Sequence, residues 1–119
     1  MRHRVKKHLH FKKKDCAHRD AVIRNLLTSF FTHRALVTTE KRAVALTGFI
    51  DSVINLVNSS KEEFNKIRTL NESMYTKEAG IAAMQIAGEY KEQKSGFTRI
   101  TPIKYRDGDA AKLVKIELI

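Results

Sequence analysis

The chain has 119 residues, with 23 Lys/Arg against 13 Asp/Glu, a net charge of +10 at pH 7, one cysteine and one proline. A chain of this length forms a single domain, a lone cysteine excludes an intramolecular disulfide, and no apolar run approaches the roughly 18 residues that a membrane-spanning helix needs. The composition predicts one globular domain in a reducing, cytoplasmic setting with no membrane partner.

The positive charge is concentrated near the N-terminus. Residues 1–34 carry ten Lys/Arg and two acids, residues 35–94 carry eight of each, and residues 95–119 carry five Lys/Arg against three acids. Residues 1–14 contain no acid, so their cations cannot pair within the segment and repel one another until a polyanion neutralises them. We interpret residues 1–14 as an extended basic RNA-binding arm and residues 15–119 as a single globular domain.

Residues 16–32 have the pattern of an amphipathic helix. Apolar residues recur every third or fourth position, and Asp15 is placed to act as the N-cap. The opposite face is polar and basic, with His18, Arg19, Arg24 and Asn25. This helix therefore continues the basic surface of the arm, and the β-prone residues 35–38 predict a short strand after it.

Thr39 is placed to offer a hydroxyl N-cap to a second helix that ends near Asn58. Its predicted buried side chains are Ala43, Leu46, Ile50, Val53, Ile54 and Val57. Residues 60–63 then match a capping box, in which the Ser60 hydroxyl begins a third helix that turns Phe64 and Ile67 inward.

Thr76 is placed to cap a fourth helix that runs to about Gln93 and ends at Ser95 and Gly96. Its apolar side consists of Ala79, Ala83, Met84, Ile86, Ala87 and Tyr90. The small residues in this set predict close packing against other helices.

From Phe97 onward the sequence predicts a terminal β-hairpin. Residues 97–105 and 113–118 are β-prone, and Asp107-Gly108-Asp109 separates them. Pro102 cannot donate to a sheet, so we expect it at a bulge or on an edge strand. The predicted order is an extended basic arm followed by α-β-α-α-α-β-β, an α+β fold of two layers with a small three-stranded sheet, antiparallel or mixed.

Histidine and cysteine gather near the N-terminus, which raises the question of a metal site. The residues are His3, His8, His10, Cys16 and His18. Zinc needs about four convergent ligands on a rigid frame, which one cysteine and scattered histidines do not supply. No base is fixed against the thiol, and neither GxxxxGK[ST] nor GxGxxG occurs. The sequence predicts no enzyme, metal, cofactor or small-molecule substrate; a small thiol- or metal-dependent enzyme is kept as an alternative.

Basic N-terminal segments also occur in targeting peptides, membrane-surface helices and DNA-binding proteins. A transit peptide would be rich in serine, and the arm has none; a membrane-surface helix would need a larger apolar face than Val5, Leu9 and Phe11 provide. A helix-turn-helix would need a basic recognition helix, whereas the predicted second helix carries only Lys41 and Arg42 near its start. An extended arm suits folded RNA, and a nucleoid-type DNA-binding protein is kept as the alternative function.

A series of short motifs resembles one family over most of the chain. In order, they are Met1-Arg2-His3-Arg4, Leu9, His18-Arg19, Ala21, Arg24-Asn25, His33, Thr38-Thr39, Arg42-Ala43, Gly96-Phe97-Thr98-Arg99-Ile100, Arg106-Asp107-Gly108-Asp109 and Ile116-Glu117-Leu118. They resemble the bacterial ribosomal protein seventeen of the large subunit. The chain departs from this pattern at Cys16-Ala17, Arg34 and Leu46-Thr47, and its arm is about two residues longer.

The resemblance implies a non-enzymatic structural protein of the large ribosomal subunit in the cytoplasm, near the exit of the peptide tunnel. Its partners would be large-subunit rRNA and neighbouring ribosomal proteins. The resemblance assigns rRNA contacts, or support of the rRNA-binding surface, to Arg2, His3, Arg4, His18, Arg19, Arg24, Asn25, Arg42 and Arg99. The charge of the arm adds Lys6, Lys7, His8, His10, Lys12, Lys13 and Lys14.

Overall fold

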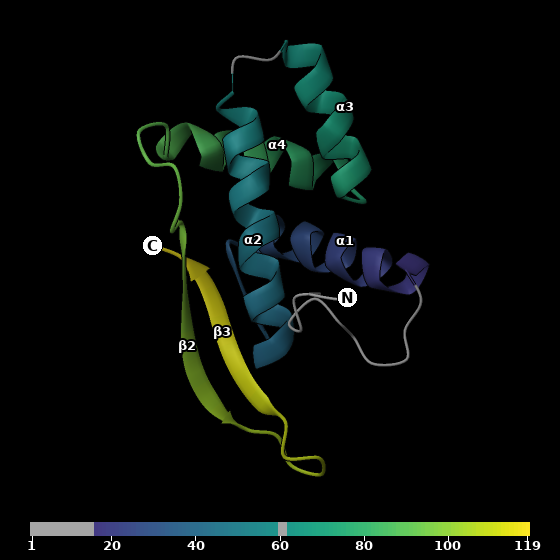
Figure 1. Cartoon of the computed structure of the whole chain (residues 1–119), viewed down its shortest axis with the longest axis vertical. Coiled ribbons are helices and arrows are strands. Elements are labelled where there is room, and N and C mark those ends of the chain that lie inside the picture. The colour runs from purple at the N-terminus through teal and green to yellow at the C-terminus, as the bar shows by residue number, and fades with distance from the viewer. Residues whose placement is uncertain (1–15, 60–61) are drawn as a thin grey trace, which may run out of the picture.

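The structure is a computed structural model that describes residues 16–59 and 62–119. The arm, the predicted Asp15 cap and Ser60 of the predicted capping box lie outside the described residues. In chain order, the elements are α1 (Cys16–His33), β1 (Ala35–Thr39), α2 (Glu40–Val57), α3 (Glu63–Ser73), α4 (Lys77–Glu89), β2 (Thr98–Tyr105) and β3 (Lys112–Leu118) (Figure 1). The predicted order of helices and strands is confirmed.

The three strands form one antiparallel sheet in the order β1-β3-β2. Leu36, Ile116 and Ile100 are aligned across the three strands on the face that meets the helices. Pro102 lies on the edge strand β2, next to a register shift between Pro102 and Lys104. Both predicted positions of the proline are correct, because an edge strand and a bulge each tolerate a residue without a backbone N–H.

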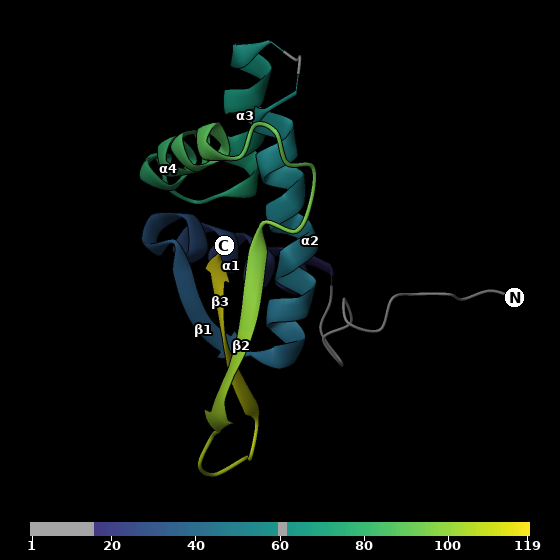
Figure 2. The ribbon, with the colours of Figure 1, turned by 90° about the vertical axis from the view of Figure 1, so that its left-hand side faces the viewer.

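The core lies between the helices and one face of the sheet. Its largest fully buried side chains include Phe30 and Phe31 from α1, packed edge to face at 5.4 Å, and Phe97 before β2. Figure 2 shows α2 running beside the sheet, while the hairpin of β2 and β3 extends beyond the helices. Residues 101–110 are accordingly exposed.

The start of α3 differs from the prediction. The helix begins at Glu63, and the residue at the N-cap position is Glu62, whose side chain makes no capping hydrogen bond. Phe64 is 66% exposed and Ile67 is 43% exposed, so the predicted inward orientation was wrong. The first turn of α3 lies past the end of α2, away from the other described helices and strands (Figures 1 and 2). Only Leu70 of this helix is buried.

The caps of the other helices were predicted with mixed success. Thr39 stands at the N-cap position of α2, but its side chain makes no capping bond, so the predicted hydroxyl cap was wrong. Thr76 caps α4 as predicted, its hydroxyl accepting from the Ala79 amide at 3.2 Å. The predicted buried face of α2 is confirmed except for Val57, which is half-buried at the edge of the core.

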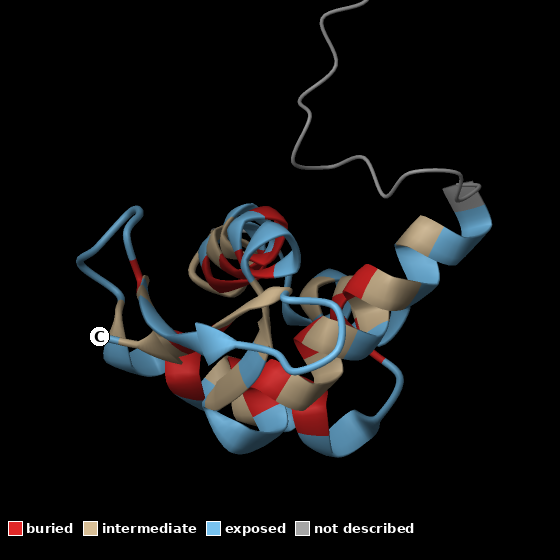
Figure 3. Cartoon of the chain, turned by 90° about the horizontal axis from the view of Figure 1, so that it is seen from below, coloured by how far each residue is buried: buried red, intermediate tan, exposed pale blue. Residues whose placement is uncertain are grey.

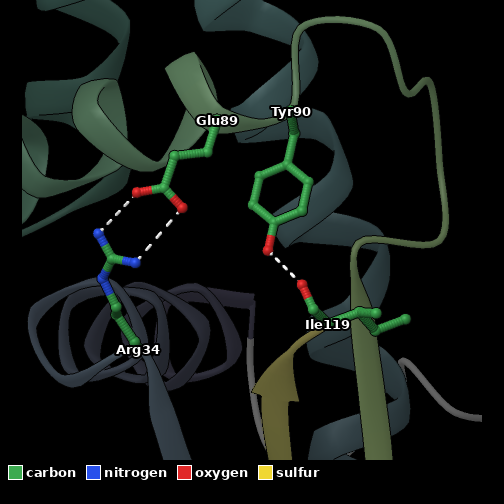
Figure 4. A network of polar contacts seen from close by, with 4 residues as sticks. All are labelled: Arg34, Glu89, Tyr90 and Ile119. Carbon is green, nitrogen blue, oxygen red and sulfur yellow. Dashed lines mark hydrogen bonds and ion pairs between the residues drawn. The ribbon is translucent and has the colours of Figure 1, made fainter.

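Helix α4 ends at Glu89, four residues before the predicted Gln93, because the backbone of Tyr90 leaves the helical conformation, with φ −121° and ψ 30°. The Tyr90 hydroxyl donates to the Ile119 carbonyl at 2.6 Å, and its ring meets Phe97 edge to face at 5.6 Å. Beside it, Arg34 donates to both carboxylate oxygens of Glu89, at 3.0 and 3.4 Å (Figure 4). These contacts join α4 to the turn after α1 and to the end of β3.

Candidate RNA interface

The described residues hold six of the predicted RNA-contacting side chains, and they lie on three elements. His18, Arg19, Arg24 and Asn25 are on α1, Arg42 is near the start of α2, and Arg99 is on β2. The ten predicted contacts of the arm, Arg2, His3, Arg4, Lys6, Lys7, His8, His10, Lys12, Lys13 and Lys14, lie outside the described residues. In the sequence, the arm precedes Asp15 and α1.

Two of the α1 residues present a polar face to solvent. His18 and Asn25 are seven positions apart, two helical turns, and both are exposed, while Arg19 beside them is half-buried. Figure 3 shows that buried and exposed residues alternate along the helices. Apolar residues such as Ile23 and Leu27 point to the core on the other side. His18 and Asn25 therefore lie on the outward, polar face of α1, as the helical spacing predicted, while Arg24 of the same predicted set bonds to the end of α3.

Arg24 has an internal role. Its guanidinium donates to the backbone carbonyls of Asn71 at 3.0 Å and Met74 at 3.2 Å, and it stacks over the Tyr75 ring at 4.4 Å. Next to it, the Thr28 hydroxyl accepts from the Tyr75 amide at 3.0 Å. Arg24 therefore ties α1 to the end of α3, a contact between segments about 50 residues apart that helical spacing alone does not indicate.

The face of the sheet turned away from the helices is basic. Arg99 and Lys115 lie on this face, each with a nitrogen 3.4 Å from a Glu117 carboxylate oxygen. Lys104 is on the same face, opposite Leu113. Glu117 pairs with Arg99 and Lys115, and Lys104 adds a third cation to the same face, so the face keeps a positive charge. Sequence reasoning selected only Arg99, although the alternation of residues 113–118 places Lys115 away from the core.

The hairpin tip is held by a compact ion pair. Arg106 donates from its Nε at 3.0 Å and from a terminal nitrogen at 2.5 Å to the Asp109 carboxylate, which also accepts from the Ala111 amide at 3.2 Å. The Arg106 hydrogen bond is the main reason that the pKa of Asp109 falls to about 2. Beside this tip, Tyr105 is 67% exposed. An exposed ring among cations is a surface on which a nucleobase can stack.

The described residues, 16–59 and 62–119, hold neither a metal-ligand cluster nor a membrane-spanning helix. No group of three or more His, Cys, Asp or Glu side chains is placed there to hold a metal ion. The same residues contain no helix that is both long enough and apolar enough to cross a membrane. The polar face of α1 and the basic outer face of the sheet are the prominent chemical features of this part of the chain.

Comparison with known proteins agrees with the motifs in the sequence. The family model described as "Ribosomal protein L17" matches residues 22–119. Proteins named "Large ribosomal subunit protein bL17" are similar to the chain. The Neorickettsia sennetsu protein is 34% identical and covers 100% of both chains, and the Wolinella succinogenes protein is 35% identical over 87% of this chain and 88% of its own. The Desulforudis audaxviator protein is 31% identical over 86% of this chain and 90% of its own. The chain belongs to the ribosomal protein L17 family.

Proposed function

We propose that the chain is a structural, non-enzymatic component of the large ribosomal subunit that binds rRNA through its basic arm and first helix. Membership of a family whose members are named as large-subunit proteins supports the assembly role. The observation that carries the rRNA contact is the charge distribution, ten Lys/Arg against two acids in residues 1–34. Cations in such excess bind a phosphate backbone by displacing its counterions.

The predicted contact residues on α1 would have two different roles, rRNA contact and support of the contact surface. His18, Arg19 and Asn25 continue the arm along the outer face of the helix, where they would contact phosphates or sugars. Arg24 would support this surface from inside by fixing α1 against α3. Arg42 would add a cation at the start of α2, close in sequence to the end of β1.

The outer face of the sheet would make a second, weaker contact with rRNA. Arg99 is the predicted contact there, and Lys104 and Lys115 join it on the same face. Glu117 partly neutralises this face, so we expect it to contribute less than the arm. Together with neighbouring ribosomal proteins, these surfaces would hold the chain in the cytoplasmic ribosome, near the exit of the peptide tunnel.

Salt dependence of RNA binding tests the role of the arm. Each neutralised phosphate contributes roughly 0.7–0.9 to the slope of log affinity against log salt. Deletion of residues 2–14 removes seven cations and should lower the slope for a large-subunit rRNA fragment by roughly 4 to 6. A matched variant with the same residues in another order should keep the slope, because phosphate contacts depend on charge and not on base sequence. An unchanged slope after deletion would refute the role of the arm.

Sedimentation tests the assembly role. The tagged full-length chain should migrate with large subunits and remain there after a high-salt wash. Preference for duplex DNA over rRNA fragments in a competition assay, without migration in subunits, would instead favour a nucleoid-type DNA-binding protein.

A further inference from the structure

The hairpin of β2 and β3 projects beyond the rest of the fold and presents one aromatic ring. β1 ends at Thr39, opposite Leu113, so the next pair of the ladder, Tyr105 and Lys112, belongs to the hairpin alone. Figures 1 and 2 show the tip of the hairpin beyond the described helices. Tyr105 is 67% exposed, the largest exposed fraction among the large hydrophobic side chains of residues 16–59 and 62–119. Its ring is therefore accessible to a partner of the chain.

Cations outnumber acids around this ring. Residues 98–118 carry five Lys/Arg against three Asp/Glu. The start of α2 lies beside the hairpin, because the Lys112 ammonium is 3.1 Å from a Glu40 carboxylate oxygen, and this start adds Lys41 and Arg42. Together, residues 40–42 and 98–118 hold seven Lys/Arg against four Asp/Glu, and ion pairs within them leave this net charge unchanged. A surface of positive net charge attracts a polyanion and repels a basic protein segment.

The backbone on the tip side of Tyr105 is fixed by hydrogen bonds. The Arg106 amide donates to the Ala111 carbonyl at 2.8 Å, and the Ala110 amide donates to the Arg106 carbonyl at 2.9 Å. The ion pair of Arg106 with Asp109 closes the same turn. A ring that is held on an ordered backbone loses less conformational entropy when it binds, so the hairpin is suited to a specific contact.

We propose that Tyr105 stacks on an unpaired nucleobase of large-subunit rRNA, and that the surrounding cations bind phosphates of the same RNA segment. An aromatic ring stacks on the face of any base, and bases outside double helices are the ones whose faces a side chain can reach. Lys104, next to Tyr105, lies on the outer face of the sheet with Arg99 and Lys115, so RNA bound to that face is adjacent to the ring. The site rests on the proposed function and deepens it, since it adds a base contact to the phosphate contacts.

Photocross-linking in assembled large subunits tests which partner faces Tyr105. The full-length chain carries the photoreactive residue azidophenylalanine in place of Tyr105, and a control chain carries it in place of Phe64, an aromatic residue of α3 with a matched exposure of 66%. Subunits are purified through a high-salt wash and irradiated. Cross-linked RNA is identified by primer extension and cross-linked protein by mass spectrometry. The probe at position 105 should cross-link to an unpaired nucleotide of rRNA, and the control should not cross-link to that nucleotide.

Chemical probing of large subunits tests stacking separately from proximity. Acylation of the ribose hydroxyl reports how freely a nucleotide moves, so the nucleotide found by cross-linking should react several-fold more in subunits that carry Tyr105→Leu. Tyr105→Phe keeps the ring and should keep the reactivity measured with the unmodified chain. Phe64→Leu, the matched loss of a ring on α3, should also leave the reactivity unchanged. Both positions are exposed, so these variants should fold normally.

The outcomes separate the stacking site from the proposed function. Cross-links from position 105 only to protein or to paired nucleotides, or no cross-link at all, would overturn the site while leaving a chain found in subunits as a large-subunit component. The same conclusion follows if Tyr105→Leu leaves the reactivity unchanged or if Tyr105→Phe raises it equally. A chain that does not enter large subunits would refute the proposed function and this site with it.

Discussion

Replacement of Arg24 by alanine should destabilise the domain while leaving the salt dependence of its RNA binding almost unchanged. The guanidinium holds the backbone carbonyls of Asn71 and Met74 and covers the Tyr75 ring, so truncation releases the end of α3 from α1. A matched control is Arg68→Ala, because Arg68 also stacks on an aromatic ring but has no hydrogen bond to the backbone of another element.

The expected loss follows from these contacts. A hydrogen bond from a charged donor contributes about 1.5–3 kcal/mol, and an exposed cation–π contact about 0.5–1 kcal/mol. The two hydrogen bonds of Arg24 come from one nitrogen at a half-buried site, so we expect a combined loss of about 2–3 kcal/mol. Arg68→Ala removes only a stacking contact and should cost less than about 1 kcal/mol.

Urea unfolding followed by circular dichroism measures the free energies of unfolding of the Arg24→Ala and Arg68→Ala variants. With a typical dependence of about 2 kcal/mol per molar urea, the midpoint for Arg24→Ala should fall by about 1–1.5 M. For the same variant, the slope of log rRNA affinity against log salt should equal that of the unmodified chain within experimental error. The internal role would be refuted if Arg24→Ala lowered the free energy of unfolding by less than about 0.5 kcal/mol and lowered the slope of log affinity against log salt by roughly 0.7–0.9. Such a result is expected of a residue that contacts one phosphate.

Three further predictions concern the core and the ionised groups. Phe30→Ala should lower the free energy of unfolding by about 3–5 kcal/mol, measured in urea, because the ring is fully buried, whereas Val37→Ala at a 55% exposed position should cost less than about 1 kcal/mol. Asp109 has a folded pKa of about 2, below its ordinary value of 3.8, so its contribution to stability is present above pH 3.8 and is lost as the pH falls toward 2. Asp109→Asn should therefore flatten the stability curve over that interval in urea titrations, and an unaltered curve would contradict the Arg106 pairing. Burial raises the pKa of Asp51 and outweighs hydrogen bonds from the Gly96 and Phe97 amides, so ionisation opposes folding as the pH rises above 3.8. The gain in stability of Asp51→Asn should accordingly be larger at pH 7 than at pH 3, and a larger gain at pH 3 would contradict this account.

Elements with strong periodicity were predicted from the sequence because their side chains meet the core at every turn. The buried face of α2 and the Thr76 cap of α4 were found as predicted. The orientation of α3 was not, since the pattern of Phe64 and Ile67 marks an apolar stripe but does not say whether another element covers it. Whether another element covers this stripe depends on the position of α3. That position is fixed in part near the C-terminal end of α3, by the bond from Arg24 of α1 and by the burial of Leu70.

The same limit applies to the candidate site. The charge of residues 1–34 and the outward face of α1 could be predicted, because charge counts and helical spacing are local properties. The internal contact of Arg24 and the clustering of Arg99 with Lys115 could not, because they join segments that are distant in the sequence. Tyr90 is a further example, since its hydroxyl bonds to the Ile119 carbonyl, 29 residues further along the chain.

The strand order also limits when the sheet can form during synthesis. β3 is the middle strand, yet β1 and β2 precede it on the chain, and neither pairs with the other. During synthesis, α1, α2 and α4 can therefore form while the outer strands β1 and β2 still lack a hydrogen-bonding partner. Residues 112–118 pair with both β1 and β2, so the sheet can form only after this segment has been synthesised and is free to fold.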